Sequence, residues 1–260
     1  MTLLGGKKAL VFGVANDHSI AWGIAEALHE HGAIVGFSSV ESLIERRVRP
    51  LAESIGATFI EPCDVTSDDD IRRVFERWRD AHGELDILVH ALAFAKREDL
   101  RGAFVDTSRD GFAVALDVSA YSLVALAREA RPLLRRGSSI MTLTYYGAEK
   151  VVANYNVMGV AKAALEASVR YLAADLGPEG IRVNAISAGP VRTLSAAGIA
   201  DLRTLYGPFA TIAPLRANIT PADVGGTAVW LASDLSGAVT GETVYVDGGF
   251  NVMGVPSPEA

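Results

Sequence analysis

Residues 9–23 read A-L-V-F-G-V-A-N-D-H-S-I-A-W-G, a short apolar run that passes through a glycine into a helix-type pattern. The run Ala9–Val14 predicts a buried strand, and Ser19 is typical of a residue that caps a helix. A glycine between such a strand and helix lets the backbone approach a pyrophosphate at the helix N-terminus. Gly13 and Gly23 fit this role only in part, because their spacing is not G-x-G-x-x-G. An ordinary capped strand–helix turn is the alternative on this feature alone.

The same alternation of strand and helix continues along the chain. Repeated strand–helix–strand crossovers build a parallel sheet that helices cover on both faces. We therefore predict one α/β domain over residues 1–260, a doubly wound Rossmann-like domain with seven parallel strands. The predicted strands are Ala9–Val14, Ala33–Ser38, Thr58–Ile60, Leu85–Val89, Ser139–Thr144, Arg182–Ile186 and Thr243–Val246. The predicted helices are Ser19–His31, Ser67–Ala81, Arg109–Arg136, Ala153–Leu176 and Pro221–Ser233, with a further helical segment 41–55 that Pro50 kinks or divides.

Two departures from the regular pattern predict positions in the fold. Pro62 directly follows the third predicted strand, which suits a strand at the edge of the sheet. Glycines and prolines interrupt residues 190–220, and we expect an insertion there that acts as a substrate lid. An irregular connection is the alternative reading of this insertion.

Composition limits the classes of function. The chain has 260 residues, of which 50% are apolar, and a formal net charge of −7. An acidic chain argues against binding to a nucleic-acid backbone, which favours a clustered basic face. Cys63 is the only cysteine, so an intrachain disulfide is impossible and a reducing, cytoplasmic location is expected. We find no apolar stretch long and charge-free enough to suggest membrane insertion, and no spacing of histidines that suggests a metal site.

The ends of the second and third strands offer contacts for a nucleotide. Glu41 would accept from the hydroxyls of an adenine ribose and repel a 2′-phosphate, which favours NADH over NADPH. Arg46 and Arg47 stand close by and could instead turn toward such a phosphate. Asp64 could reach the adenine amine, although an acid that starts the next helix is an almost equal alternative.

The catalytic candidates lie in N-Y-N-V-M-G-V-A-K, residues 154–162. Tyr155 and Lys162 stand seven positions apart, nearly two turns of a helix, so they are expected to share one face. The lysine can hold a nicotinamide ribose and lower the pKa of the phenol, which then donates a proton or stabilises an oxyanion. Tyr146 and Lys150 have the Y-x-x-x-K spacing of ordinary carbonyl reductases, but they follow the strand too closely. We therefore prefer the pair Tyr155 and Lys162.

Longer stretches of the sequence carry a specific resemblance. T-Y-Y-G-A-E-K-V-V-A-N-Y-N-V-M-G-V-A-K-A-A-L-E and V-N-A-I-S-A-G-P-V-R-T-L resemble the bacterial, NADH-dependent enoyl-acyl-carrier-protein reductases of the short-chain dehydrogenase/reductase superfamily. Those enzymes use a Tyr-x6-Lys pair with a second tyrosine ten residues earlier, which here is Tyr145. The similarity extends from G-V-A-N-D-H-S-I-A-W-G to V-D-G-G-F and covers essentially the whole chain.

The resemblance implies roles for particular residues. Tyr145, Tyr155 and Lys162 would be catalytic, and Ala95 would contact the substrate together with the two tyrosines. Val40 replaces a residue that is often polar in this family, which leaves the NADH preference less secure. Besides Val40 and Lys162, the implied cofactor contacts are Gly13, Ser19, Ile20, Asp64, Val65, Leu92, Val191, Arg192, Thr193, Leu194 and Ser195.

The function implied is the reduction of trans-2-enoyl thioesters on acyl carrier protein with NADH, in the elongation cycle of fatty acid biosynthesis. Tyr145 would shape the pocket near the thioester, with an aromatic filler at a strand end as the alternative. The resemblance also implies a homotetramer, and Arg192, Arg203 and Arg216 are candidates to meet the acidic carrier protein. A carbonyl or alcohol dehydrogenase of the same superfamily and a non-catalytic NAD-binding module remain as alternative functions. His90 is expected to be structural.

Overall fold

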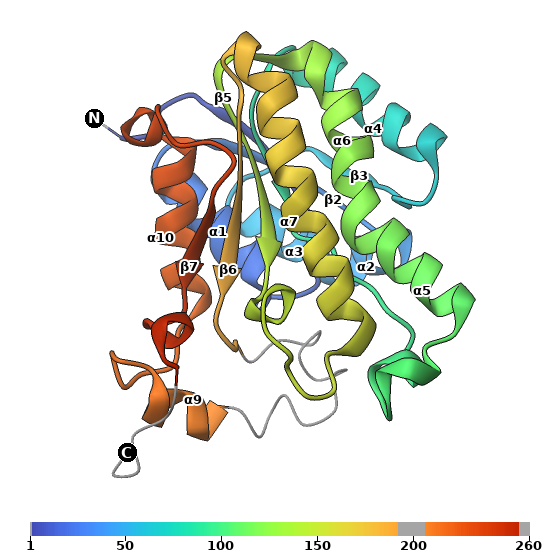
Figure 1. The fold of residues 1–260 in the computed structure, drawn as a ribbon. Helices are drawn as coiled ribbons and strands as arrows, with labels where there is room; N and C mark the ends of the chain where they lie inside the picture. The colour runs from blue at the N-terminus through green and yellow to red at the C-terminus, as the bar shows by residue number, and fades with distance from the viewer. Residues whose placement is uncertain (1, 192–205, 255–260) are drawn as a thin grey trace.

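The computed structural model describes residues 2–191 and 206–254, and these contain a seven-stranded sheet in which every strand pair is parallel (Figure 1). The strand order is β3-β2-β1-β4-β5-β6-β7. The strand numbers rise outward on both sides of the boundary between β1 and β4, so the winding of the chain reverses there. The predicted doubly wound fold is therefore confirmed. The strands are β1 Lys8–Phe12, β2 Ile34–Ser39, β3 Ile60–Pro62, β4 Leu85–His90, β5 Leu134–Thr144, β6 Arg182–Ala188 and β7 Thr243–Val246.

Helices cover both faces of this sheet. In β1, Ala9 and Val11 face one apolar core, whereas Leu10 and Phe12 face the other, as the two-residue period of a strand requires. The first core is closed by α1 (Ile20–Glu30), the short helices α2 (Glu41–Leu43) and α3 (Arg49–Ser54), and α10 (Pro221–Ala232). The second is closed by α4 (Asp68–His82), α5 (Arg109–Leu116), α6 (Ser122–Ala130) and α7 (Asn156–Leu176). A further short helix, α9, spans Tyr206–Ile212.

Caps and prolines set most of the helix boundaries. Ser19 caps α1 by accepting from the backbone N–H of Trp22, and Ser67 caps α4 in the same way, as each hydroxyl position predicts. Pro50 stands in the first turn of α3, where its missing N–H costs nothing. Since proline is tolerated at a helix start but not in a helix interior, the segment 41–55 is divided. Pro62 ends β3, which lies at the sheet edge as expected.

The predicted helix Arg109–Arg136 is wrong in its interior and at its end. A π-helical turn, Asp117–Tyr121, separates α5 from α6, and a single 3-10 turn at Arg131–Leu133 leads straight into β5. Pro132 lies in that turn and cannot continue an α-helix. The strand β5 therefore begins at Leu134, five residues before the predicted Ser139.

Gly23 packs one helix against another. A Cβ on Gly23 would lie 2.5 Å from the Cβ of Pro221, and a Cβ on Gly225 would lie 2.6 Å from the carbonyl oxygen of Gly23. The two glycines therefore allow α1 and α10 to cross closely. Gly23 serves this helix contact, and its predicted place beside a pyrophosphate stays a prediction.

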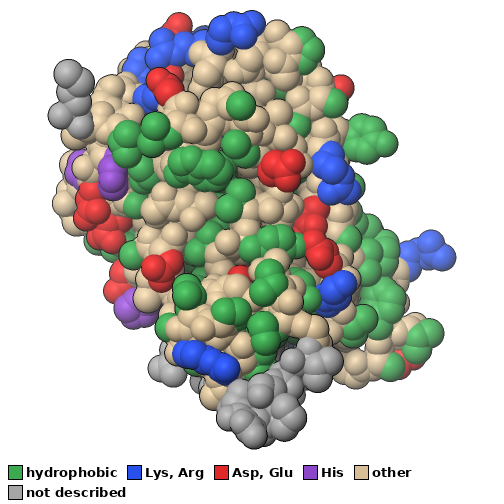
Figure 2. Space-filling view, turned by 60° about the vertical axis from the view of Figure 1, so that its left-hand side comes forward, with side chains coloured by type: hydrophobic (Ala, Val, Ile, Leu, Met, Phe, Trp, Pro, Cys, Tyr) green, Lys and Arg blue, Asp and Glu red, His purple; other side chains and the backbone are tan. Residues whose placement is uncertain are grey.

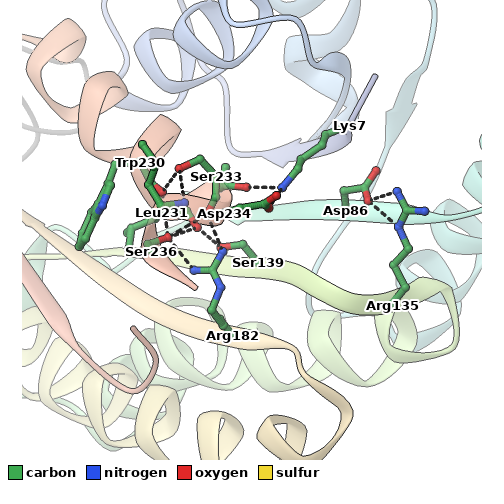
Figure 3. A network of polar contacts seen from close by, with 12 residues as sticks. Lys7, Asp86, Arg135, Ser139, Arg182, Trp230, Leu231, Ser233, Asp234 and Ser236 are labelled. Atoms are coloured by element: carbon green, nitrogen blue, oxygen red, sulfur yellow. Dashed lines mark hydrogen bonds and ion pairs between the residues drawn. The ribbon is translucent and has the colours of Figure 1, made fainter. Parts of the chain in front are cut away.

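A polar network, buried around Arg182 and exposed at Asp234, lies at the amino ends of the strands (Figure 3). The Arg182 guanidinium donates to Ser236 Oγ at 2.9 Å and to the carbonyl of Ser233 at 3.3 Å. Ser139 Oγ donates to the carbonyl of Leu231, and Lys7 Nζ pairs with Asp234 at 2.8 Å. These contacts hold the end of α10 against the amino ends of the strands, opposite the carboxyl ends where the residues of catalytic interest lie.

The segment Arg109–Leu133 is long and apolar enough to span a membrane by length and composition, but half of its apolar window is buried inside the fold. Its inner side packs on the sheet, which accounts for part of that apolar character.

Candidate active site

The candidate site lies at the carboxyl ends of the parallel strands, which meet at one edge of the sheet (the lower end in Figure 1). β1 ends at Phe12, β4 at His90, β5 at Thr144 and β6 at Ala188. In open α/β sheets, ligands bind outside these ends, at the point where the strand order reverses. The predicted site residues that the structure describes are therefore brought to one side of the molecule.

Tyr155 stands just before α7 rather than inside it. The helix begins at Asn156, three residues later than the predicted Ala153, and Tyr155 is its N-cap residue. Asn154 and Asn156 on either side have φ values of 60° and 40°. Asparagine tolerates this left-handed region better than most residues. The pair of asparagines therefore turns the chain sharply on both sides of the tyrosine.

Two glycines and a second aromatic ring surround the Tyr155 side chain, which is 6% exposed. A Cβ on Gly147 would lie 2.5 Å from Tyr155 Cδ1, and a Cβ on Gly159 would lie 2.8 Å from the carbonyl oxygen of Gly147. The rings of Tyr145 and Tyr155 meet edge to face with centroids 4.9 Å apart. Packing of this kind fixes the position of a ring.

Lys162 lies on the buried side of α7, with 5% of its surface exposed. Its Nζ donates to the carbonyl of Leu143 at 2.7 Å. Burial lowers the pKa of Lys162 to about 8, against the nearby carboxylate of Glu166, which raises it. The amine of Lys162 is therefore buried close to the end of β5.

One electrostatic expectation is wrong. The pKa of the Tyr155 phenol is raised, first by burial and then by the nearby Tyr145 and Glu166, and not lowered by Lys162. Burial disfavours the charged phenolate, and this effect exceeds any from the lysine. Tyr155 therefore holds its proton, as a hydrogen-bond donor must.

The competing pair, Tyr146 and Lys150, lies outside this arrangement. Tyr146 begins a 3-10 turn directly after β5, and its ring packs edge to face on Phe250 at 5.8 Å. Lys150 is exposed. The loop position predicted for the pair is confirmed.

His90 at the end of β4 is fully buried and has a hydroxyl at each ring nitrogen. Nδ1 lies 2.7 Å from Thr142 Oγ1 and Nε2 lies 2.8 Å from Ser122 Oγ. Ser122 donates its proton to the carbonyl of Val118, so it must accept from Nε2–H, and Thr142 donates to Nδ1. Burial and the charge of Lys162 lower the pKa of His90 to about 3, so the ring stays neutral. His90 is therefore structural, as predicted.

The turn between β1 and α1 fits the pyrophosphate of a dinucleotide. Gly13 has a φ of 100°, and a Cβ there would lie 2.2 Å from the carbonyl oxygen of Ala91, so only glycine lets β1 and β4 end this close together. Ser19 caps α1 and Ile20 is its first residue, which leaves backbone N–H groups at a helix start that favours anions. A cavity of about 660 Å³ opens beside it, lined partly by His18, Trp22 and residues 190–191. This volume lies in the usual range for cofactor sites.

Further predicted cofactor contacts lie just beyond the ends of β2, β3 and β4. Val40 is exposed just after β2. The Asp64 carboxylate is exposed and accepts from the backbone N–H and the hydroxyl of Thr66, ahead of the Ser67 cap of α4. Val65 and Leu92 are partly buried beside the second core. The structure places these residues at the carboxyl ends of the strands, but it does not test their contact with a nucleotide.

Ala95 packs in the same small apolar cluster as Tyr155 and Tyr145. The loop that carries it is held by Ser119 of the π-helical turn, whose hydroxyl accepts from Phe94 N–H and donates to Phe94 C=O, both at 3.0 Å. Val191 is buried after β6. Arg192, Thr193, Leu194 and Ser195 lie outside the described residues, as does the rest of the segment 192–205 within the predicted lid.

Two residues near the site were not predicted. Ser119 has no signal in the sequence, because its role depends on a π-helical turn. Glu166 stands one helical turn after Lys162 in A-K-A-A-L-E, and an acid within an apolar helix face is a signal that could have been used. Across residues 2–191 and 206–254, no group of three His, Cys, Asp or Glu side chains could hold a metal ion.

A doubly wound parallel sheet, a capped helix start at its switch point and a buried tyrosine with a lysine on the next helix define a nucleotide-dependent oxidoreductase of the short-chain dehydrogenase/reductase superfamily. A family model described as enoyl-(acyl carrier protein) reductase matches residues 13–251. The chain is 53% identical to the enoyl-(acyl-carrier-protein) reductase (NADH) FabI of Bacillus cereus, over 98% of this chain and all of that one. The chain belongs to the enoyl-(acyl carrier protein) reductase family.

Solved structures agree with this assignment. A Bacillus cereus enoyl-acyl carrier protein reductase with NADP⁺ and an indole naphthyridinone superposes with a TM-score of 0.95 and 52% identity, over 98% of this chain and 100% of that one. The Anaplasma phagocytophilum reductase in complex with NAD gives a TM-score of 0.94 and 51% identity, over 98% and 97% of the two chains.

Proposed function

We propose that this protein reduces trans-2-enoyl thioesters carried on acyl carrier protein to saturated acyl thioesters, with NADH as the reductant, in fatty acid elongation. The observation that carries the proposal is the buried Tyr155, packed against Tyr145 beside the strand end that Lys162 contacts. The three relatives described above are all named as enoyl reductases, one as NADH-dependent, one in complex with NAD and one with NADP⁺.

The cofactor contacts follow from the same edge of the sheet. Gly13, Ser19 and Ile20 would hold the pyrophosphate, and Val40, Asp64 and Val65 would lie at the adenosine end. Leu92 and the segment Val191 to Ser195 would lie along the rest of the cofactor, and Lys162 would bind the nicotinamide ribose. When bound, the cofactor supplies a hydride to the β-carbon of the enoyl group.

The chain's own residues act on the thioester. As negative charge moves onto the thioester oxygen, the Tyr155 hydroxyl donates a hydrogen bond to it. This interaction strengthens only as charge develops, so it lowers the barrier rather than merely tightening binding. Burial keeps the Tyr155 proton in place by raising the pKa of the phenol. Tyr145 would border the thioester and Ala95 would contact the substrate through its backbone.

Lys162 reaches the end of β5 through a backbone carbonyl, and its amine lies within the buried part of α7. The amine can exchange its hydrogen bond to Leu143 for hydrogen bonds to ribose hydroxyls at little cost in free energy. Both are charge-assisted hydrogen bonds and are therefore similar in strength. The lysine would therefore orient the cofactor beside Tyr155.

We further propose a cytoplasmic homotetramer. Apolar side chains of α5 to α7 remain exposed on one side, among them Phe112, Tyr121 and Tyr171. A second apolar area lies on the face that carries α10 and the edge strand β7, where Figure 2 shows green side chains gathered between charged ones. If each of these two faces packs against the same face of another copy, four copies form a closed assembly.

An assay of NADH oxidation tests the reaction. We expect turnover with crotonyl-CoA, a higher kcat/KM with crotonyl-acyl carrier protein, and no turnover with acetoacetyl-CoA. The higher kcat/KM with the carrier-protein substrate would come from basic side chains that contact the acidic carrier protein. Among the described residues the candidate is the exposed Arg216, since Arg192 and Arg203 lie outside them. Turnover of acetoacetyl-CoA in place of the enoyl substrate would favour a carbonyl reductase and contradict the proposal.

A further inference from the structure

Glu166 is a buried acid on α7, one turn beyond Lys162, and the reaction proposed above assigns it no role. Its side chain is 8% exposed, and Thr144 Oγ1 donates to its Oε1 at 2.6 Å. Burying a carboxylate is costly unless it is hydrogen-bonded and paired with a charge. An acid retained at such a place therefore points to a function that needs its charge.

Lys162 and Glu166 join the same two elements. Lys162 Nζ donates to the carbonyl of Leu143, and Glu166 accepts from the side chain of Thr144, the next residue of β5. Tyr145 follows immediately after this strand. Because residues four apart on a helix share a face, the cation and the anion lie side by side against the strand end.

The charge of Glu166 reaches both proposed catalytic groups. It raises the pKa of Lys162 against burial and contributes to the raised pKa of Tyr155. Burial and Glu149 raise the pKa of Glu166 itself, whereas Thr144, Arg170 and Lys162 lower it. The remaining titratable groups around this pair are His90 of β4, whose pKa the charge of Lys162 lowers, and Tyr245 of β7, which donates to Glu149 and whose own pKa the charge of Glu166 raises.

We propose that Glu166 is a positioning residue of the active site, whose carboxylate keeps the positive charge on Lys162 and, through Thr144, fixes the end of β5 that carries Tyr145. The proposal rests on the proposed role of Lys162 in cofactor binding. Lys162 can bind ribose hydroxyls as a cation only below its own pKa, so Glu166 extends the pH range over which the enzyme works.

Three variants separate the charge from the hydrogen bond. Glu166→Gln removes the charge and keeps an oxygen that accepts from Thr144. Thr144→Val keeps the carboxyl group of Glu166 and removes the hydroxyl that donates to it. Asp175→Asn removes a charge from the exposed side of the same helix and serves as the matched control.

The first measurement is the pH profile of kcat/KM with crotonyl-CoA and NADH. Loss of a close opposite charge shifts a pKa by about one unit or more. In Glu166→Gln we therefore expect the alkaline limb to move to lower pH by about one pH unit, with little change at pH 6.5. Thr144→Val should move it in the same direction by less, because Glu166 is then more easily protonated. Asp175→Asn should leave the profile of the wild type.

The second measurement needs no cofactor and no turnover. Protein labelled with ¹³C at lysine Cε contains few signals, because the lysines are Lys7, Lys8, Lys96, Lys150 and Lys162. Titration of the ligand-free protein should give a midpoint for Lys162 that falls by about one pH unit in Glu166→Gln and not in Asp175→Asn. Lys162→Met identifies the signal by its absence.

An unchanged Lys162 midpoint in both Glu166→Gln and Thr144→Val would overturn the proposal, as would variants that lose rate equally at every pH. If Glu166→Gln does not fold, Thr144→Val alone decides in the same way. A wild-type protein that fails to reduce crotonyl-CoA would contradict the proposed function instead, and the titration of Lys162 would still test the role of Glu166.

Discussion

At the scale of single residues, the position of the Tyr155 ring depends on the absence of a side chain at Gly147. A methyl group there would lie 2.5 Å from Tyr155 Cδ1, closer than atoms can approach, so the ring must shift. Displacement of a reacting group by about 1 Å can cost about 100-fold in rate. We predict that Gly147→Ala lowers kcat/KM for crotonyl-CoA by about 10- to 100-fold, measured by NADH oxidation.

Gly177, beyond the end of α7, provides the control, because a Cβ there would meet nothing within 4 Å. Gly177→Ala should keep the wild-type kcat/KM. A Gly147→Ala enzyme with unchanged kcat/KM would show that the ring position is not limiting.

The candidate catalytic residues could be named from the sequence because their spacing is a local property of the chain. Spacing selected Tyr155 and Lys162, and the family resemblance added Tyr145. The structure packs the two tyrosines together and buries the lysine on the adjoining helix, while their catalytic roles stay a prediction. The pKa of Tyr155 could not be predicted, since it is set by burial that depends on Gly147 and other distant segments.

At the scale of elements, the order of strands and helices was predictable, and so was the division of segment 41–55 near Pro50, but the interruption of the helix after Leu116 was not. The apolar pattern of 109–130 continues through the π-helical turn Asp117–Tyr121, which changes hydrogen-bond partners without changing the pattern of side chains. The start of α7 was predicted too early because Asn154, before the helix, and Asn156, its first residue, both have positive φ. Backbone strain of this kind is decided by tertiary contacts.

The helices α5 to α7 also predict how copies of the chain associate. Tyr171 of α7 is 76% exposed on this apolar side. We predict that sedimentation velocity gives four chains for the wild type and a smaller species for Tyr171→Glu, because a buried charge at an interface is costly. Ser54→Glu, on the exposed side of α3 in the other layer, should keep the wild-type assembly. A monomeric wild type would contradict the tetramer.

At the scale of the whole molecule, the site exists because a parallel sheet brings the carboxyl ends of β1, β4, β5 and β6 to one edge. The alternation of strands and helices was enough to predict this topology, and the observed strand order confirms it. The alternation of strands and helices could not predict which buried polar groups support the carboxyl ends of the strands. The hydrogen bonds of His90, Ser119 and Glu166 connect residues 22 to 52 positions apart in the chain.

The central claim is that the Tyr155 hydroxyl stabilises the charge that develops on the thioester oxygen. The most direct test is the single-turnover rate of crotonyl-CoA reduction with saturating NADH in Tyr155→Phe and Tyr146→Phe. We predict that Tyr155→Phe slows this rate by about 100-fold while NADH binding is retained, and that Tyr146→Phe stays close to the wild type. A wild-type rate in Tyr155→Phe, or loss of turnover in Tyr146→Phe alone, would contradict the account.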